Sequence, residues 1–289
     1  MSDQTYSKTA LQAFMRCPRH FKHTYLDKRE AKADDDFKLN FGKAFHVGVE
    51  AFWLGMELPY IDRVRSMVGA VSAAYPAMVD EYMKVLLACY CDRWGSSVYE
   101  VISAEQTIEG GCSGINFKGI IDAVVKLKGK TYLVETKTTS TNIADGSFYW
   151  DLDFDLQNGL YSYLAEQKGY EVSGVIYDVI KLPSTRQGKQ GRTYFDESSE
   201  EFVHRLTKEV QKNYDKYFVR RIVDVDVAVI DDAVGVAQQI EHMKSLGPSA
   251  FYRNSKACNA FGRKCEFNPV CKGDTTIDND DLYQIRSHR

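Results

Sequence analysis

The chain has 289 residues, of which 44% are hydrophobic and 27% charged, a composition typical of a globular protein with a sizeable core. No segment approaches the roughly 18 apolar residues that span a membrane, and the first ten residues lack the charged-then-apolar pattern of a signal peptide. We therefore expect an intracellular, cytoplasmic protein. The net charge of −3 does not indicate nucleic-acid binding, although a local basic groove is enough to attract phosphates.

The N-terminal third is predicted to be mostly helical. Helical periodicity indicates helices over residues 7–25, 41–55 and 62–94, with a polar loop over 28–38. Ser7 is a candidate N-cap for the first of these helices. Pro18 fits a break, or the first turn of a further helix, within the first segment.

Strand patterns begin near Tyr99. Three consecutive strands are predicted over residues 99–110, 115–128 and 130–139, the last two joined as a hairpin at Gly129 and Lys130. A helix, a strand, an exposed basic loop and two helices should follow, over about residues 153–168, 171–182, 181–192, 198–218 and 230–246. With no internal repeat and no convincing linker, the simplest fold is one compact α/β domain with a central mixed sheet flanked by helices.

The strand KTYLVETKTT (residues 130–139) ends in Glu135 and Lys137. Side chains alternate along a strand, so these two point the same way, and hairpin pairing can bring Asp122 alongside them. Two convergent carboxylates suit Mg²⁺ or Mn²⁺, and a nearby lysine can stabilise the charge that develops when water attacks a phosphodiester. The alternative is a solvated strand end with a weak ion pair. These three residues alone do not decide between the two.

Two helical pairs add weight to a functional site. His46 and Glu50 are four residues apart, which places both on one face of a helix. The imidazole offers a nitrogen ligand, and Glu50 offers a third carboxylate or a partner for bound water. Gln157 and Tyr161 are likewise four apart, on the helix after the Glu-x-Lys strand. Taken singly, each pair also fits ordinary structure, as a core histidine beside a surface glutamate or as helix-surface polarity.

The order of these parts resembles the RecB-like branch of the PD-(D/E)XK nuclease superfamily. That branch has a helical His motif, a strand Asp, a Glu-x-Lys strand and a Gln-x3-Tyr helix, and the matching stretches here are GKAFHVGVE, GIIDAVV, VETK and QNGLY. The resemblance implies a restriction-endonuclease-like core with a helical N-terminal part. It also implies metal binding by His46, Asp122 and Glu135, with Lys137 positioning or polarising the attacking water.

The same resemblance assigns the remaining candidates. Gln157 and Tyr161 would shape the site and contact DNA as part of the catalytic set. Glu50 and the backbone carbonyl of Thr136 are further candidate metal ligands, the first placed by helical geometry as much as by the motif.

The seven cysteines cannot form a fully paired disulfide framework, and clustered thiols in a reducing compartment indicate metal. Zinc knuckles keep cysteine pairs about two to four residues apart, which the wider gaps in CNAFGRKCEFNPVC fit poorly. The arrangement resembles the iron–sulfur staple of RecB-type nucleases, including the AddB nuclease domain and exonucleases associated with CRISPR spacer acquisition. There, one N-terminal cysteine in a Cys-Pro-x2-Phe setting, here CPRHF, joins three C-terminal ones, although the C-terminal spacing departs from the commonest Cys-x2-Cys-x5-Cys form. The resemblance implies a [4Fe–4S] cluster on Cys17, Cys258, Cys265 and Cys271.

Such a staple would join segments more than two hundred residues apart and close a very long loop. Buried free thiols and a zinc staple are the alternatives. Cys89, Cys91 and Cys112 are expected to be ordinary thiols, since the first two are only two residues apart in a helix and should not share a face. We therefore expect a single nuclease domain over residues 1–272 that carries both halves of the staple. The C-terminal tail, residues 273–289, is expected to add little to the core.

Two basic clusters are candidate phosphate contacts, although each also fits a solvated charge run. The first comprises Arg16, Arg19, His20, Lys22 and His23 beside Cys17, and the second comprises Lys181, Arg186, Lys189 and Arg192 in the polar loop. Arg16, Arg19, Lys22, Arg186 and Lys189 are the candidate DNA contacts. The function expected from the motif set is a Mg²⁺- or Mn²⁺-dependent DNA exonuclease acting on single-stranded ends, in repair, recombination, phage DNA metabolism or CRISPR adaptation. The alternative is a non-catalytic DNA-end binding or recombination partner on a nuclease fold. No Gly-x4-Gly-Lys-Ser/Thr motif is present, so a helicase partner would be a separate polypeptide.

Overall fold

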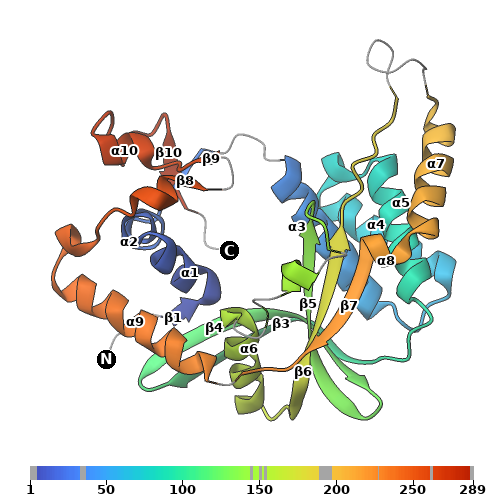
Figure 1. Cartoon of the computed structure of the whole chain (residues 1–289), viewed down its shortest axis with the longest axis horizontal. Helices are drawn as coiled ribbons and strands as arrows, with labels where there is room; N and C mark the ends of the chain where they lie inside the picture. The colour runs from blue at the N-terminus through green and yellow to red at the C-terminus, as the bar shows by residue number, and fades with distance from the viewer. Residues whose placement is uncertain are drawn as a thin grey trace.

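The computed structural model describes residues 5–32, 37–143, 146–149, 152, 155–188, 197–226, 228–260 and 263–286 (Figure 1). Its central sheet has six strands in the described residues: β1 (Thr5–Ser7), β3 (Glu100–Cys112), β4 (Ile115–Leu127), β5 (Lys130–Thr139), β6 (Val172–Lys181) and β7 (Phe218–Val223). β1–β4 and β5–β6 are parallel pairs, and β3–β4, β4–β5 and β6–β7 are antiparallel. The predicted mixed sheet is confirmed.

Helices cover both faces of this sheet (Figure 1). One layer consists of α3 (Phe37–Leu54), α4 (Tyr60–Ala74), α5 (Glu81–Trp94), α7 (Ser199–Lys212) and α8 (Tyr214–Tyr217), and the other of α1 (Lys8–Arg16), α6 (Leu156–Gln167) and α9 (Val229–Ser245). The alternation of side chains in β5 and β6 explains the two layers. Leu133 and Tyr177 belong to the core on the α1, α6 and α9 side, whereas Val134 and Ile176 belong to the core on the α3 and α5 side.

Local sequence signals set several helix starts. Ser7 caps α1 as predicted, and its hydroxyl accepts from the Ala10 N–H at 3.2 Å. Asp155 caps α6 in the same way, accepting from the Gln157 N–H at 2.7 Å. Because each cap satisfies an N–H group that the helix itself leaves unpaired, the first turns of both helices are fixed. These first turns carry Lys8 and Gln157.

Two predicted elements are corrected by the structure. The 28–38 loop contains a strand, β2 (Arg29–Ala31), and the predicted helix over 198–218 gives way to β7 at Phe218. β7 owes its place to a distant partner, because Arg220 pairs with Asp178 of β6 at 2.9 Å and both side chains are buried. Long-range pairing of this kind overrides local periodicity.

The edge of β4 that faces β5 is open in its middle. β3 pairs along one edge of β4, while on the other edge β1 pairs with residues 116–118 and β5 with residues 123–127. The described ladders therefore leave residues 119–122 without a strand partner on that edge. The divergence of β1 from β5 makes room there for side chains from the helices.

Segments from near the two ends of the chain, residues 18–31 and 259–285, lie together beyond this sheet (Figure 1). They form a terminal cap of α2 (Pro18–Phe21), a π-helical turn (Lys22–Leu26), β2, β8 (Asn259–Ala260), β9 (Arg263–Lys264), α10 (Asn268–Lys272) and β10 (Tyr283–Ile285). The expectation that the tail adds little is wrong: β10 pairs with β2, and Tyr283 is buried and stacks on Phe267. Among the described residues, no helix is long and apolar enough to cross a membrane.

Candidate functional site

Asp122 and Glu135 meet at the open edge of β4. The β4–β5 ladder ends with Ala123 opposite Val134, so Asp122 and Glu135 are the next residues on the two strands. Asp122 Oδ2 accepts the Thr136 backbone N–H at 2.7 Å, and Glu135 is buried. Burial raises the pKa of both carboxyls, and that of Glu135 is raised further by Asp122. Two carboxylates held this closely require a cation or a proton between them.

Lys137 places a positive charge beside these carboxylates. Its Nζ donates to Glu135 Oε1 and to Gln157 Oε1, the latter at 3.1 Å, while the Gln157 amide donates to Glu135 Oε2. Burial alone would lower the pKa of Lys137, but the adjacent carboxylate of Glu135 outweighs it and the pKa is raised. Lys137 is therefore a fixed ammonium group, as the predicted shared face with Glu135 requires.

α3 brings an imidazole to the carboxylates. Nδ1 of His46 lies 3.7 Å from Asp122 Oδ2. Burial lowers the pKa of His46 despite the attraction of Glu135, so its neutral form, which has a free nitrogen lone pair, is favoured near neutral pH. Glu50 lies one helical turn further along α3.

Tyr161 of α6 fills the gap between β1 and β5. Its pKa is raised chiefly by burial and then by Glu135, and the backbone of Ile120 forms a hydrogen bond with its phenol oxygen. The ring lies directly against Gly119, where an added Cβ would stand 2.3 Å from Cε1. Gly119 is thus the residue that admits Tyr161 to the open edge.

Sequence reasoning missed three charged side chains at this site. Lys8 of α1 donates to Gln157 Oε1 at 2.8 Å, and Asp155 accepts from the Tyr177 hydroxyl at 3.0 Å. Glu105 lies opposite Asp122 in the β3–β4 ladder and has a positive φ of 47°. Although Glu105 is exposed, loss of hydration at its carboxyl, with Asp122 and Glu50 nearby, raises its pKa to about 7. Of these three residues, only Glu105 could have been predicted from the sequence, because a hairpin turn at Ser113 places it opposite Asp122.

The four predicted cluster cysteines come together in the terminal cap. The Cys17 sulfur accepts the Asn254 N–H at 3.4 Å, and the Cys258 thiol donates to the Asn254 carbonyl at 3.8 Å. Burial raises the pKa of Cys271, and Cys17 and Cys258 are both close enough to raise it further. Burial likewise raises the pKa of Cys265 to about 11, and Cys271 contributes to this shift. One sequence-distant thiol and three C-terminal thiols therefore occupy one neighbourhood.

The other three cysteines lie elsewhere. Cys89 and Cys91 are buried in α5, and burial raises the pKa of both, that of Cys89 to about 12. Such thiols are inert core groups. Cys112 ends β3. His20 and Glu266 lie beside one of the four cysteines, Cys265. The ligand atoms of these three residues are within 4.8 Å of one another among the described residues, and His20 bonds to Glu266 at 2.9 Å.

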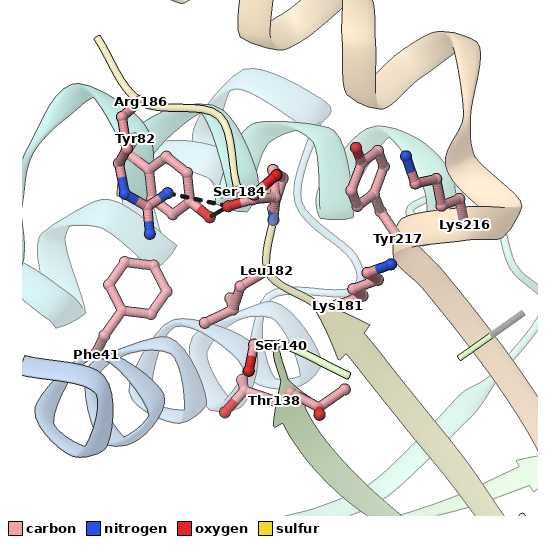
Figure 2. A pocket seen from close by; sticks show the side chains of 12 residues that line it. Phe41, Tyr82, Thr138, Ser140, Lys181, Leu182, Ser184, Arg186, Lys216 and Tyr217 are labelled. Atoms are coloured by element: carbon pink, nitrogen blue, oxygen red, sulfur yellow. Dashed lines mark hydrogen bonds between the residues drawn. The ribbon is translucent and has the colours of Figure 1, made fainter. Parts of the chain in front are cut away.

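Most predicted DNA-contact residues have structural partners. Arg19 Nε donates to the Phe251 carbonyl at 2.6 Å, and Lys22 pairs with Asp27 at 2.7 Å. Arg16 is exposed at the end of α1, and its carbonyl accepts from Asn254 at 2.8 Å. Arg186 lines a cavity on the α3 and α5 side of the sheet (Figure 2). Lys189 lies outside the described residues.

The pKa shifts predict how pH acts on the metal-free protein. A carboxyl group in the unfolded chain has a pKa of about 4. Carboxyls whose pKa is higher than this in the folded protein stabilise the fold at low pH, and this stabilisation is lost as the pH rises through their folded pKa values. In EDTA at pH 8, Glu135→Gln should therefore raise Tm by about 2–4 °C, equivalent to about 1 kcal/mol in a chain of this size. At pH 5 wild type and Glu135→Gln should have the same Tm.

Thermal unfolding of wild type and Glu135→Gln at both pH values checks this expectation. Glu109→Gln, at an exposed glutamate of β3, is the control and should show no such pH dependence. A wild type that is more stable than Glu135→Gln at pH 8 in EDTA would contradict it.

A buried carboxylate, a half-buried carboxylate and an imidazole are donors that suit a divalent metal, and a carboxylate-paired ammonium lies beside them at the edge of a mixed sheet, an arrangement typical of a metal-dependent hydrolase. The chain belongs to the PD-(D/E)XK nuclease superfamily, whose sequence profile matches residues 5–272. Membership implies nuclease catalysis with a divalent metal, and DNA as the substrate. No curated protein matches the chain closely enough to count as a relative. The crystal structure of SSO0001 is similar at 16% identity and a TM-score of 0.40, over 96% of this chain and 89% of that one, a likeness too weak to support a functional conclusion.

Proposed function

We propose that the chain is a Mg²⁺- or Mn²⁺-dependent DNA exonuclease that hydrolyses phosphodiester bonds from single-stranded ends. The observation that carries this proposal is the convergence of Asp122, Glu135 and Lys137 at the open edge of β4, where Gln157 hydrogen-bonds to both Glu135 and Lys137. Buried like charges raise the free energy of the site without a cation, and hard oxygen donors with one imidazole suit a small divalent metal.

His46, Asp122 and Glu135 would hold the metal, and Glu50 and the Thr136 carbonyl are the further candidate ligands. When bound, the metal lowers the pKa of a coordinated water and neutralises charge on the phosphodiester. The ammonium of Lys137, fixed by Glu135 and Gln157, would orient the attacking water and stabilise the negative charge on the pentacoordinate phosphorus of the transition state. Tyr161 of α6 would form part of the wall of the metal site.

Hydrogen bonds support a positioning role for Gln157. Its amide bridges Glu135 and Lys137, and its oxygen also accepts from Lys8 at 2.8 Å. Outer partners of this kind hold ligands in place, and their loss costs about 10–100-fold in activity or metal affinity. Lys8 thereby connects the N-terminal helix with the site.

The second part of the proposal is a [4Fe–4S] cluster on Cys17, Cys258, Cys265 and Cys271. It is supported by the mutual proximity of these thiols and by their separation from the inert thiols of α5. A four-thiolate cluster would hold the four cysteines on iron and join the start of α2 to the C-terminal segments of the terminal cap.

The function is tested with 20-nucleotide DNA carrying a label at the 5′ or the 3′ end, as single strands and as blunt duplexes, with Mn²⁺, Mg²⁺ or EDTA. An exonuclease on single-stranded ends releases the label at one end as a short product and shortens the other species stepwise, faster on single strands. Internal products from a circular single strand would make the enzyme an endonuclease. Binding without cleavage by cluster-loaded protein would favour a non-catalytic DNA-end module.

Gly119→Ala should disturb the site through Tyr161. The added methyl would lie 2.3 Å from Tyr161 Cε1, and a displacement of about 1 Å at a catalytic site can cost about 10²-fold in rate. We expect cleavage to fall about 10–100-fold, with an overpacking cost of about 1–3 kcal/mol in the free energy of unfolding. Gly69→Ala in α4, where an added Cβ meets nothing within 4 Å, is the matched control. Equal cleavage rates for the two variants would rule out this role of Gly119.

A further inference from the structure

Lys8 places a second ammonium group at the edge of the candidate site. β1 pairs with β4, and α1 begins directly after β1, so Lys8 is the first residue of that helix (Figure 1). Its side chain is half-buried, and its Nζ donates to Gln157 Oε1 at 2.8 Å. Lys8 therefore belongs to the hydrogen-bond network that also holds Glu135 and Lys137.

Two ammonium groups share one neutral oxygen atom in this network. Lys137 Nζ lies 3.1 Å from Gln157 Oε1, the same atom that accepts from Lys8. Lys137 also pairs with the carboxylate of Glu135. Among the described residues, by contrast, no carboxylate oxygen lies within ion-pair distance of Lys8. The two ammonium groups therefore have one carboxylate partner between them.

The two carboxylates that attract Lys8 from further away are held by other donors. Asp155 accepts the Gln157 backbone N–H at 2.7 Å, and Glu135 accepts from Lys137 and from the Gln157 amide. Burial, and then the charge of Lys137, lower the pKa of Lys8 despite the attraction of these two carboxylates. The charge of Lys8 thus lacks a counterion close by, and a bound anion would supply one.

The place of Lys8 in its helix gives no structural reason for a lysine. The N-terminus of a helix is the positive end of its dipole, where acidic side chains are favoured and basic ones are not. α1 has no acidic residue in its first turn and begins with Lys8 instead. Proteins break local preferences of this kind mostly at functional sites.

A backbone phosphate of the DNA strand is the anion that suits this position. Phosphate oxygens accept charge-assisted hydrogen bonds, and lysine binds them as a point charge on a flexible stem. Lys8 meets the network at Gln157, whereas Lys137 donates directly to the proposed metal ligand Glu135. Lys8 is therefore further from the metal site than Lys137, on the side where the strand continues past the scissile phosphate.

We infer that Lys8 is a substrate-binding residue whose ammonium group contacts the DNA backbone phosphate next to the scissile one. The inference rests on the proposed nuclease function and adds to it a substrate contact outside the metal centre. With the strand bound, this phosphate is the counterion of Lys8 and holds the strand in register with the metal site. The strength of binding should depend on this contact more than the chemical step does.

The test measures binding of a 5′-fluorescein-labelled 20-nucleotide oligothymidylate by fluorescence anisotropy, in EDTA, across a range of NaCl concentrations. Each phosphate contact contributes about 0.7 to the slope of log K against log salt for single strands. Lys8→Met should therefore lose about 0.7 of that slope and bind about 5-fold more weakly at 0.1 M NaCl. Lys8→Arg keeps the charge and should keep the slope.

Lys130→Met is the matched control for a lost lysine. Lys130 is exposed at the start of β5, at the opposite end of the strand from Lys137, and its variant should keep the wild-type slope. The inference is overturned if Lys8→Met keeps the slope of Lys130→Met, or if Lys8→Arg loses as much of the slope as Lys8→Met does.

A second comparison separates a phosphate contact from a purely structural role of Lys8. If Lys8 only held Gln157 in place, adding Lys8→Met to Gln157→Leu would change nothing further. A phosphate contact predicts that the double variant still loses about 0.7 of the salt slope relative to Gln157→Leu alone. Equal slopes for these two proteins would overturn the inference.

Neutralising single phosphates in the DNA identifies the one that Lys8 contacts. Oligothymidylates with one uncharged methylphosphonate linkage, moved stepwise along the strand, are compared in single-turnover cleavage with Mn²⁺. For wild type, the linkage next to the cleaved bond should raise the enzyme concentration that gives half the maximal rate. Lys8→Met has already lost this contact and should be insensitive at that linkage alone. Equal sensitivity of both proteins at every linkage would overturn the inference.

Cleavage assays separate this inference from the proposed function. If Glu135→Gln cleaved DNA at the wild-type rate, the proposed function would fail, and the inference with it. If Glu135→Gln were inactive while Lys8→Met kept the salt slope of Lys130→Met, only the role of Lys8 would have been assigned wrongly.

Discussion

Glu135→Gln is expected to lower the rate of Mn²⁺-dependent cleavage of single-stranded DNA by about 10³-fold or more. The substitution removes a carboxylate that faces Asp122 and accepts from both Lys137 and Gln157. One change therefore removes a proposed metal ligand and releases the ammonium that would orient the attacking water. Single-turnover cleavage of labelled oligonucleotide measures the effect.

Lys137→Met separates the effect of the ammonium group on cleavage from the binding of the metal. Methionine approximates the length of lysine without its charge, so cleavage should fall about 10²–10³-fold, whereas Mn²⁺ affinity should stay within a few-fold of wild type. Glu109→Gln is the control for a lost carboxylate on the same sheet. Wild-type rates for either Glu135→Gln or Lys137→Met would refute the assigned centre.

Cys17→Ser is expected to cause the largest loss of stability. A bridge between Cys17 and the C-terminal cysteines closes a loop of more than two hundred residues, and the chain-entropy relation gives about 5 kcal/mol for a cross-link of that length. At about 2–4 °C per kcal/mol in chains of this size, Tm should fall by about 10–20 °C. The broad visible absorption of the anaerobically purified protein should disappear with it.

Cys112→Ser is the matched control, because Cys112 ends β3 away from the terminal cap. It should keep both the colour and the Tm of wild type. A colourless wild type that contains zinc would replace the iron–sulfur assignment by a zinc staple. A Cys17→Ser protein with unchanged Tm would contradict any four-thiolate bridge.

The sequence predicts the geometry of the candidate site where that geometry depends on local spacing. The shared face of Glu135 and Lys137 follows from strand alternation, and the placement of His46 follows from helical periodicity. The hairpin register likewise brings Asp122 opposite Glu135. These relationships span only a few residues or one turn, so the pattern itself contains them.

The rest depends on contacts between segments far apart in the sequence. β2 pairs with β10 across some 250 residues, and no feature of Arg29–Ala31 alone predicts a strand. Lys8 reaches the site only because β1 pairs with β4 and α1 begins directly after β1. The open edge at residues 119–122, which admits Tyr161, likewise results from two strands sharing one edge of β4.

The metal dependence of cleavage by the anaerobically purified wild type tests the central claim most directly. A labelled oligothymidylate is incubated in EDTA, then with increasing Mn²⁺, in parallel with Asp122→Asn and with Lys130→Ala as a charge control. The account predicts no cleavage in EDTA, saturable cleavage with Mn²⁺ by wild type and Lys130→Ala, and at least about 10³-fold less by Asp122→Asn. Cleavage that persists in EDTA, or that Asp122→Asn carries out at the wild-type rate, would contradict it.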